Sequence, residues 1–374
     1  MSLQDLCNPV SSQNSVRSGI LSVSSYEDYD LVSADAFLLG YLEDRNSSNQ
    51  GASAAAAKIR ESLYSLHSVS KPMRIYDLGD CKQGSTIAES YANLKSCVAQ
   101  LMVYGKPIIV FGGTQEAVCS VAESCFQRIK FPAACFVDAR IDWESDVNDF
   151  SNTAYLGTFC AEHPSARITH VANQEYLSSR EAFSWLRERH FGCLRLGECN
   201  ASIALAEPLI RDAQLVSFDM GAVRYSDNPA GQNVNGLYSE FACQCAWYAG
   251  YSPRMKMFLV SDYIPSKDLD SISAQLGAQI VWHVLDGVSQ RKNETMDFDD
   301  ETYQKRYMKH PMFPQDICFY ESLVSQTMWV EIPIGTTDKK RIVPCCSNDY
   351  EQFRNGIVPE LWMTEFLRLS QLEK

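Results

Sequence analysis

Short apolar runs alternate over most of the chain with longer stretches in which apolar residues recur every three or four positions. The short runs are typical of strands buried in a parallel sheet, and the longer stretches are typical of amphipathic helices. The pattern therefore predicts an α/β fold with a mainly parallel sheet. Strands are expected at residues 35–41, 75–80, 106–111, 133–137, 193–196, 215–219 and 256–261, and helices at 52–66, 91–103, 181–189, 204–211, 239–249 and 272–285.

The same pattern divides the chain into three parts. Residues 1–30 are polar and rich in serine and are expected to form a flexible lead-in, whereas residues 31–289 carry the alternating strands and helices. Residues 290–374 form an extension of a different kind, which we interpret as a small α+β element packed on the main domain or on a neighbouring subunit. It begins with a charged linker at 291–305 and continues with expected strands at 317–320, 328–332 and 341–345 and a helix at 360–372.

Polar residues follow three of the expected strands at the point where each strand ends. Gln115 comes shortly after strand 106–111, Asp138, Arg140 and Asp142 follow strand 133–137, and Asp219 ends strand 215–219. Open α/β sheets bind their ligands outside the carboxyl ends of the strands. These five side chains are therefore expected to converge on one polar site. Residues 143–173, which come next in the chain, are polar and predict no clear element.

These strand ends resemble the signatures of the arginase family, the ureohydrolases that include arginase, agmatinase and formimidoylglutamase. Residues 112–115 (Gly-Gly-Thr-Gln) resemble the family's Gly-Gly-x-His, residues 138–142 (Asp-Ala-Arg-Ile-Asp) its Asp-Ala-His-x-Asp, and residues 217–221 (Ser-Phe-Asp-Met-Gly) its Ser-x-Asp-x-Asp. The resemblance spans residues 35–286 and is closest in character to formimidoylglutamase. It implies a three-layer α/β/α domain, two manganese ions that activate a bridging hydroxide, and assembly into a homo-oligomer.

Each signature departs from the family at one metal ligand. Gln115 and Arg140 replace histidines, and Gly221 replaces an aspartate. Arginine is permanently cationic, and two positive groups at close range repel by several kcal/mol at an effective dielectric of about 20. We therefore expect no dinuclear centre, and expect Arg140 to bridge Asp138 and Asp219 in place of the metal. The alternative is a single manganese or magnesium ion held by oxygen atoms. Its ligands would be Gln115, Asp138, Asp142 and Asp219.

Candidate roles follow from the same positions. The family ends a later strand with Glu-x-x-Pro, whose glutamate contacts substrate, and residues 262–265 (Asp-Tyr-Ile-Pro) carry a shorter acid there. Gln115, Arg140 and Asp262 are thus the candidate substrate contacts. Histidine is a common proton carrier, but His163 and His170 are expected to be structural or solvent-facing, and His283 to be a core residue. The candidate catalytic residues are Asp138, Asp142, Asp219 and Asp262.

Three functional hypotheses remain open on these residues. The first is a catalytically inactive or strongly altered protein with a binding or regulatory role. The second is a divergent hydrolase of linear carbon–nitrogen bonds in amidines, such as formimidoylglutamate or guanidino compounds, working with one metal ion or none. The third is a salt-bridged plug without function. Fold alone does not choose among them.

Composition narrows the class of partner. The formal charge of −13 over 374 residues argues against nucleic acid or an anionic membrane as a partner, because both attract concentrated Lys and Arg. No apolar run has the length of a membrane span, and the first residues lack the apolar core of a secretory signal. The 14 cysteines include no CxxC pair, which favours free thiols in a reducing cytoplasm. A small molecule is therefore the expected partner.

Overall fold

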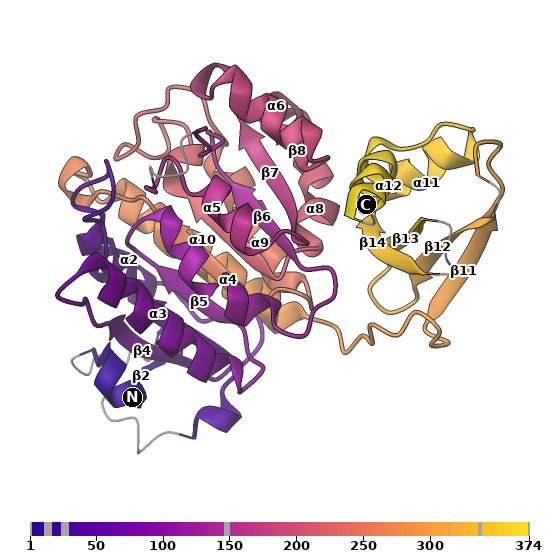
Figure 1. Cartoon of the computed structure of the whole chain (residues 1–374). Coiled ribbons are helices and arrows are strands. Elements are labelled where there is room, and N and C mark those ends of the chain that lie inside the picture. The colour runs from indigo at the N-terminus through magenta and orange to yellow at the C-terminus, as the bar shows by residue number, and fades with distance from the viewer. Residues whose placement is uncertain are drawn as a thin grey trace.

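The computed structural model describes residues 2–10, 17–23, 30–145, 150–313, 315–335 and 339–372. Within these residues the chain forms a large α/β domain and a smaller C-terminal unit, joined by the segment that follows α10 (Figure 1). No helix in the described ranges combines the length and the apolar character needed to cross a bilayer.

The main domain is built on one ten-stranded sheet in the order β1-β4-β3-β5-β10-β9-β6-β7-β8, with β2 also paired to β4. All pairs are parallel except β1 with β4. The strands are β1 (Cys7–Asn8), β2 (Ile20–Ser22), β3 (Ala36–Gly40), β4 (Ile75–Cys81), β5 (Ile108–Phe111), β6 (Ala133–Val137), β7 (Arg167–Asn173), β8 (Gly192–Arg195), β9 (Leu215–Asp219) and β10 (Met257–Ser261).

Helices cover both faces of this sheet, which confirms the expected three layers. Residues of α2, α7, α8, α9 and α10 form the core on one face, and residues of α1, α3, α4, α5 and α6 form it on the other. The helices are α1 (Leu3–Leu6), α2 (Ala55–Ser65), α3 (Ile87–Met102), α4 (Val118–Phe126), α5 (Leu156–Glu162), α6 (Arg180–Glu188), α7 (Leu196–Ala201), α8 (Glu207–Arg211), α9 (Ser239–Tyr251) and α10 (Ile272–Gln290).

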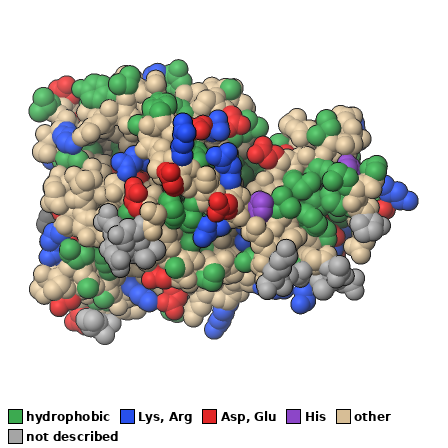
Figure 2. All heavy atoms as spheres, turned by 45° about the horizontal axis from the view of Figure 1, so that its top comes forward, with side chains coloured by type: hydrophobic (Ala, Val, Ile, Leu, Met, Phe, Trp, Pro, Cys, Tyr) green, Lys and Arg blue, Asp and Glu red, His purple; other side chains and the backbone are tan. Residues whose placement is uncertain are grey.

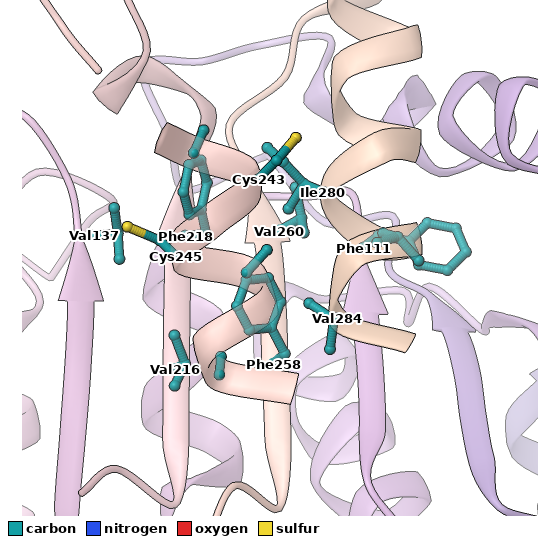
Figure 3. Close-up of a cluster of buried hydrophobic side chains, with 14 of the residues drawn as sticks. Phe111, Val137, Val216, Phe218, Cys243, Cys245, Phe258, Val260, Ile280 and Val284 are labelled. Atoms are coloured by element: carbon teal, nitrogen blue, oxygen red, sulfur yellow. The ribbon is translucent and has the colours of Figure 1, made fainter. Parts of the chain in front are cut away.

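Apolar residues on successive strand positions serve opposite faces of the sheet. Phe111 packs with the α9 and α10 side, whereas its neighbour Val110 packs with the α3 and α4 side. Figure 3 shows the first of these cores, where Cys243 of α9 and Ile280 of α10 lie over the central strands. Because both faces are covered, the central strands are apolar at nearly every position. Charged residues of these central strands are therefore confined to the strand ends.

Two segments of the main domain differ from the sequence-based expectation. In the described parts of residues 1–30, Leu6 is buried and β2 pairs with β4. These parts therefore pack as an element of the main domain, and the expectation of a flexible lead-in is wrong for them. Residues 143–173, which predicted no element, contain α5 and the wholly buried β7. The sequence pattern did not predict β7, because this core strand contains polar residues such as Arg167 and His170.

The C-terminal unit is a four-stranded antiparallel sheet, β11-β12-β13-β14, covered by two helices. β11 extends through part of the expected linker, because its adjacent charged residues Lys305 and Arg306 belong to an edge strand. Trp362 and Phe353 pack the helices on the sheet, and Figure 2 shows hydrophobic side chains gathered on the face of the unit that it presents. Its elements are β11 (Tyr303–Met308), β12 (Ile317–Ser322), β13 (Met328–Pro333), β14 (Lys340–Cys345), α11 (Ser347–Arg354) and α12 (Glu360–Leu372).

A buried ion network joins the two units. The carboxylate of Asp212 accepts from Arg167 at 2.9 Å, from Arg254 at 2.5 Å and from Arg341 of β14 at 2.8 Å. Glu365 of α12 accepts from Arg341 at 2.5 Å. Burial alone would raise the pKa of Asp212, but the three guanidinium groups together hold it below its usual range. Asp212 therefore neutralises positive charge contributed by both units.

Candidate functional site

Four adjacent strands bring the candidate residues to one edge of the sheet. β5, β10, β9 and β6 lie side by side in that order and run parallel. Their carboxyl ends lead into Gln115, Asp262, Asp219 and Asp138 respectively. The expected convergence of three strand ends is thus observed, and β10 adds Asp262 between two of them.

The turn after β5 positions Gln115. Gly112 and Gly113 have φ values of 95° and 64°, in the left-handed region that favours glycine. A Cβ on Gly112 would lie 2.7 Å from the carbonyl oxygen of Tyr41, so only glycine fits against that backbone. Gln115 is fully buried and donates from Nε2 to the Ser217 hydroxyl at 3.0 Å. Its Oε1 is buried without a hydrogen-bond partner in the described structure.

Asp138 and Asp142 are also deeply buried, each 3% exposed. Asp138 Oδ1 accepts from the backbone N–H of Arg140 at 3.0 Å, and its Oδ2 has no partner among the described groups. Burial, with the nearby charge of Asp142, raises the pKa of Asp138 well above its usual range. Burial also raises the pKa of Asp142 to about 8. Burial therefore favours the protonated forms of these two neighbouring carboxyl groups more than it would for exposed aspartates.

Asp219 and Asp262 complete the cluster and are less deeply buried. Asp219 accepts from the backbone N–H of Gly221 at 2.5 Å, and Asp262 accepts from Asn49 at 2.8 Å and Asn152 at 3.4 Å. Burial raises the pKa of both, and the charge of Asp262 adds to the shift at Asp219. Asp262 has φ 63°, a strained value for a residue with a side chain.

Arg140 does not bridge Asp138 and Asp219, so that expectation is wrong. Its side chain is 43% exposed, and its one ion pair with a described acid is a long contact from Nε to Asp142 Oδ1 at 3.5 Å. The turn bonds the Arg140 backbone, not its side chain, to Asp138. The guanidinium thereby stays hydrated, which avoids the large free-energy cost of burying it.

The structure adds Glu116, which the sequence comparison with the family did not single out. It is 1% exposed, and it accepts from Thr114 at 2.7 Å and from Tyr91 at 3.1 Å. Burial, with the charge of Asp262, raises its pKa to about 8. The one feature of the sequence that could have indicated Glu116 as a site residue is its position directly after the turn that ends β5. Glu116 makes the cluster more acidic than expected.

The three histidines occupy structural positions. His170 of β7 is 1% exposed, and burial lowers its pKa to about 4. His163 packs edge-on against the rings of Phe126 and Phe159. His283 is not a core residue as expected, because it lies half-buried on α10 and contacts the Gln279 carbonyl at 2.7 Å.

The residues present do not fit a two-manganese centre. Gly221 has no side-chain donor atom, and the half-exposed Arg140 side chain brings a positive charge to within 3.5 Å of Asp142 instead of a ligand atom. Within the described ranges, no three or more His, Cys, Asp or Glu side chains are grouped closely enough to hold a metal ion. The buried, unpartnered oxygens of Gln115, Asp138 and Asp262 are donor atoms open to a single hard cation.

Replacing Asp142 with asparagine is expected to stabilise the protein at alkaline pH. The folded pKa of about 8 lies above the ordinary value of 3.8, so the stability contributed by the protonated form is lost as pH rises through that interval. Asparagine cannot ionise, and we expect a gain of roughly 1–3 kcal/mol at pH 9 and little change at pH 5. Urea unfolding with a chelator present measures both.

The matched control for this experiment is Asp227→Asn. Asp227 accepts from Arg224 at 2.9 Å, and although partial burial opposes it, that partner lowers its pKa. Neutralising it should reduce stability at neutral and alkaline pH, the opposite sign. An Asp142→Asn variant that is no more stable than the original chain at pH 9 would show that Asp142 is ionised without penalty.

Comparison with known proteins supports the fold alone. Neither the models of protein families nor the curated proteins match this chain. Among solved structures, formiminoglutamase of Trypanosoma cruzi with Mn2+ is 21% identical, with a TM-score of 0.64 over 72% of this chain and 97% of that one. Formimidoylglutamase of Bacillus subtilis is 16% identical, with a TM-score of 0.63 over 72% and 95%. Agmatine ureohydrolase of Thermoplasma volcanium is 19% identical, with a TM-score of 0.60 over 70% and 92%.

Proposed function

We propose that this arginase-fold chain does not assemble a two-manganese centre and binds a small cationic molecule at the acidic strand ends, in a binding or regulatory role. The observation that carries the proposal is the loss of donor atoms at Gly221 and Arg140 while the acids around them remain. A protein that had lost all use for this edge would be expected to replace buried acids by apolar residues, because unpaired buried carboxyls destabilise the fold.

The ligand class follows from the chemistry of the cluster. Asp138, Asp142, Asp219, Asp262 and Glu116 all have raised pKa values, with burial as the first cause. A bound cation would offset that burial and release the protons. A planar amidinium or guanidinium pairs with carboxylates through two parallel hydrogen bonds. Asp219 and Asp262, the two less buried acids of the cluster, are the residues a ligand would contact first.

A second candidate function is hydrolysis of a linear amidine with one manganese or magnesium ion or none. It is favoured by the unpartnered buried oxygens of Gln115, Asp138 and Asp262. Buried oxygens without a partner are rare in proteins and often mark a missing ion or water. The solved structure of T. cruzi formiminoglutamase holds Mn2+, so the same fold supports a metal site there.

Metal analysis together with ligand binding distinguishes the two functions. The purified chain, with and without added manganese, should carry far less than one ion per chain and release no ammonia or formamide from formimidoylglutamate. Calorimetry with agmatine and formimidoylglutamate as probes should show saturable binding that Asp219→Asn weakens and Asp227→Asn leaves intact. Stoichiometric manganese with ammonia release would establish the hydrolase instead, and absence of both binding and release would reject both functions.

We also propose that the chain works in the cytoplasm and self-associates. None of the 14 cysteines, all of which lie in the described ranges, forms a disulfide, and several such as Cys135 and Cys245 are deeply buried, which suits a reducing compartment. Light scattering coupled to gel filtration measures the assembly directly, and a monomer at all concentrations would contradict the second half of the proposal.

A further inference from the structure

A cavity of about 1020 Å³ lies at the edge of the sheet opposite the acidic cluster. Residues that precede β5, β6, β9 and β10 line it, including Lys106, Phe131, Gln214 and Lys256. Arg291 of the linker and residues of β14 also line it, so the cavity lies where the main domain meets the C-terminal unit. Its volume is at the upper end of the range for small-molecule sites.

The lining of this cavity is strongly cationic in a chain that is acidic as a whole. Eight of its described lining residues are Lys or Arg and none is Asp or Glu, against a net charge of −13 for the chain. Arg254 and Arg341 are paired with Asp212, and Lys340 is paired with Glu331 at 2.7 Å. The remaining five have no carboxylate partner among the described residues. They are Lys106, Arg128, Lys130, Lys256 and Arg291.

Arg291 is the most informative of these residues. Its guanidinium donates to the backbone carbonyls of Gly250 at 2.8 Å and Met255 at 3.0 Å. Burial lowers its pKa to about 10, with no nearby acid to oppose the shift. Carbonyl groups satisfy the hydrogen bonds of a guanidinium but do not cancel its charge. The cavity wall therefore holds a positive charge that nothing described neutralises.

The alternative explanation is that these cations stabilise helix ends. The C-termini of α3, α9 and α10 lie near this edge, and cations are favourable there. Arg291 does serve the end of α9 in this way. Lys106 and Lys256, however, lie beyond the last turns of α3 and α9, where the effect of the helix dipole has fallen off, and neither donates to a carbonyl in the described structure. Their charges face the cavity without a local role.

We propose that this cavity binds a small phosphate-bearing organic molecule. Phosphate groups carry nearly two negative charges each and accept from several lysine and arginine donors at once. Phe131 and Phe298, with Met296 beside them in the lining, provide apolar surface for the organic part of the molecule. A cavity between two units admits a small molecule, whereas the acidic surface of the whole chain disfavours a nucleic acid.

Titration calorimetry of the full-length chain tests the proposal, with ATP, pyrophosphate and citrate as probes at 50 mM and 500 mM salt. ATP is expected to bind at low salt and more weakly at high salt, with citrate at least tenfold weaker than ATP. The Lys106→Ala, Lys256→Ala double variant should lose at least tenfold in ATP affinity. Both lysines are only partly buried, so the fold should be retained, and circular dichroism checks this.

The matched control removes the same charge elsewhere, by Lys71→Ala with Lys309→Ala, two exposed lysines outside the cavity lining. This control should bind ATP as the original chain does. The proposal is rejected if no phosphate probe binds at 50 mM salt, if citrate binds as tightly as ATP, or if the control loses as much affinity as the cavity variant. Retention of ATP affinity in a folded cavity variant would likewise reject it.

Discussion

Replacing Asp212 with alanine is expected to lower the free energy of unfolding by about 3–5 kcal/mol, the largest single-residue effect that we predict for this chain. The carboxylate is 1% exposed and accepts from Arg167, Arg254 and Arg341. Its removal would leave three guanidinium groups buried or half-buried, of which Arg167 and Arg341 keep Glu365 as an acidic partner in the described structure. Breaking one side of a buried ion pair is far more destabilising than losing a surface pair.

The effect should also appear at the junction between the two units, because Arg341 belongs to β14 of the C-terminal unit and Asp212 to the main domain. Urea unfolding gives the stability change, and limited proteolysis between residues 291 and 302 reports whether the units separate. The control is Asp299→Ala, which removes an acid that is 88% exposed and paired only with Lys305. Asp212→Ala and Asp299→Ala with equal unfolding midpoints would show that the network does not hold the units together.

The second large effect is a gain of metal binding by Gln115→His, Arg140→His and Gly221→Asp together. These changes return the ligand types that the resemblance to the arginase family implies, on a scaffold whose fold is shared with a solved Mn2+-bound structure. The triple variant should bind about two manganese ions per chain. Metal at one hundred times its dissociation constant should then stabilise the fold by about 2.7 kcal/mol for each ion bound.

The substitutions at positions 221 and 140 each require a local rearrangement of side chains. A Cβ on Gly221 would lie 3.0 Å from Asp219 Oδ1, so the Asp219 carboxylate must shift slightly. The shift is possible because the atom in the way belongs to a side chain and not to the backbone. At position 140 the side chain must turn inward from its present half-exposed direction. The double variant Gln115→His with Arg140→His, which keeps Gly221, is the control and should bind at most one ion. No manganese uptake by the triple variant would mean that the backbone of the strand ends has also changed.

The acidic cluster and the cationic cavity lie at opposite ends of the same strands. β5, β10, β9 and β6 begin beside the cavity and end at the cluster. A parallel sheet imposes this, because all its strands start at one edge and finish at the other. The cluster uses the edge where this class of fold binds ligands, whereas the cavity needs the C-terminal unit to complete it. The two sites are therefore chemically independent, and an experiment that rejects ligand binding at one of them does not reject binding at the other.

Much of the fold could be predicted from the chain. Apolar runs located the central strands, and the helix at 360–372 was placed with its observed bounds. The pattern failed at β7, because Arg167 and His170 are buried polar residues, and the partner of Arg167, Asp212, comes from a distant part of the chain. It failed again at β11, where an exposed edge strand has the charged composition of a linker. In both cases tertiary contacts override the local signal.

Which acids end which strands could be read from the chain alone, since strand length and the direction of a parallel sheet leave a strand-end residue no other edge to occupy. Where the side chains point and what surrounds them depend on the three-dimensional fold. Arg140 turns to water, Glu116 is buried beside Asp262, and Arg291 lies in a cavity wall without an acid. Direction and burial depend on turns, hydration and neighbours hundreds of positions away, which no local pattern encodes.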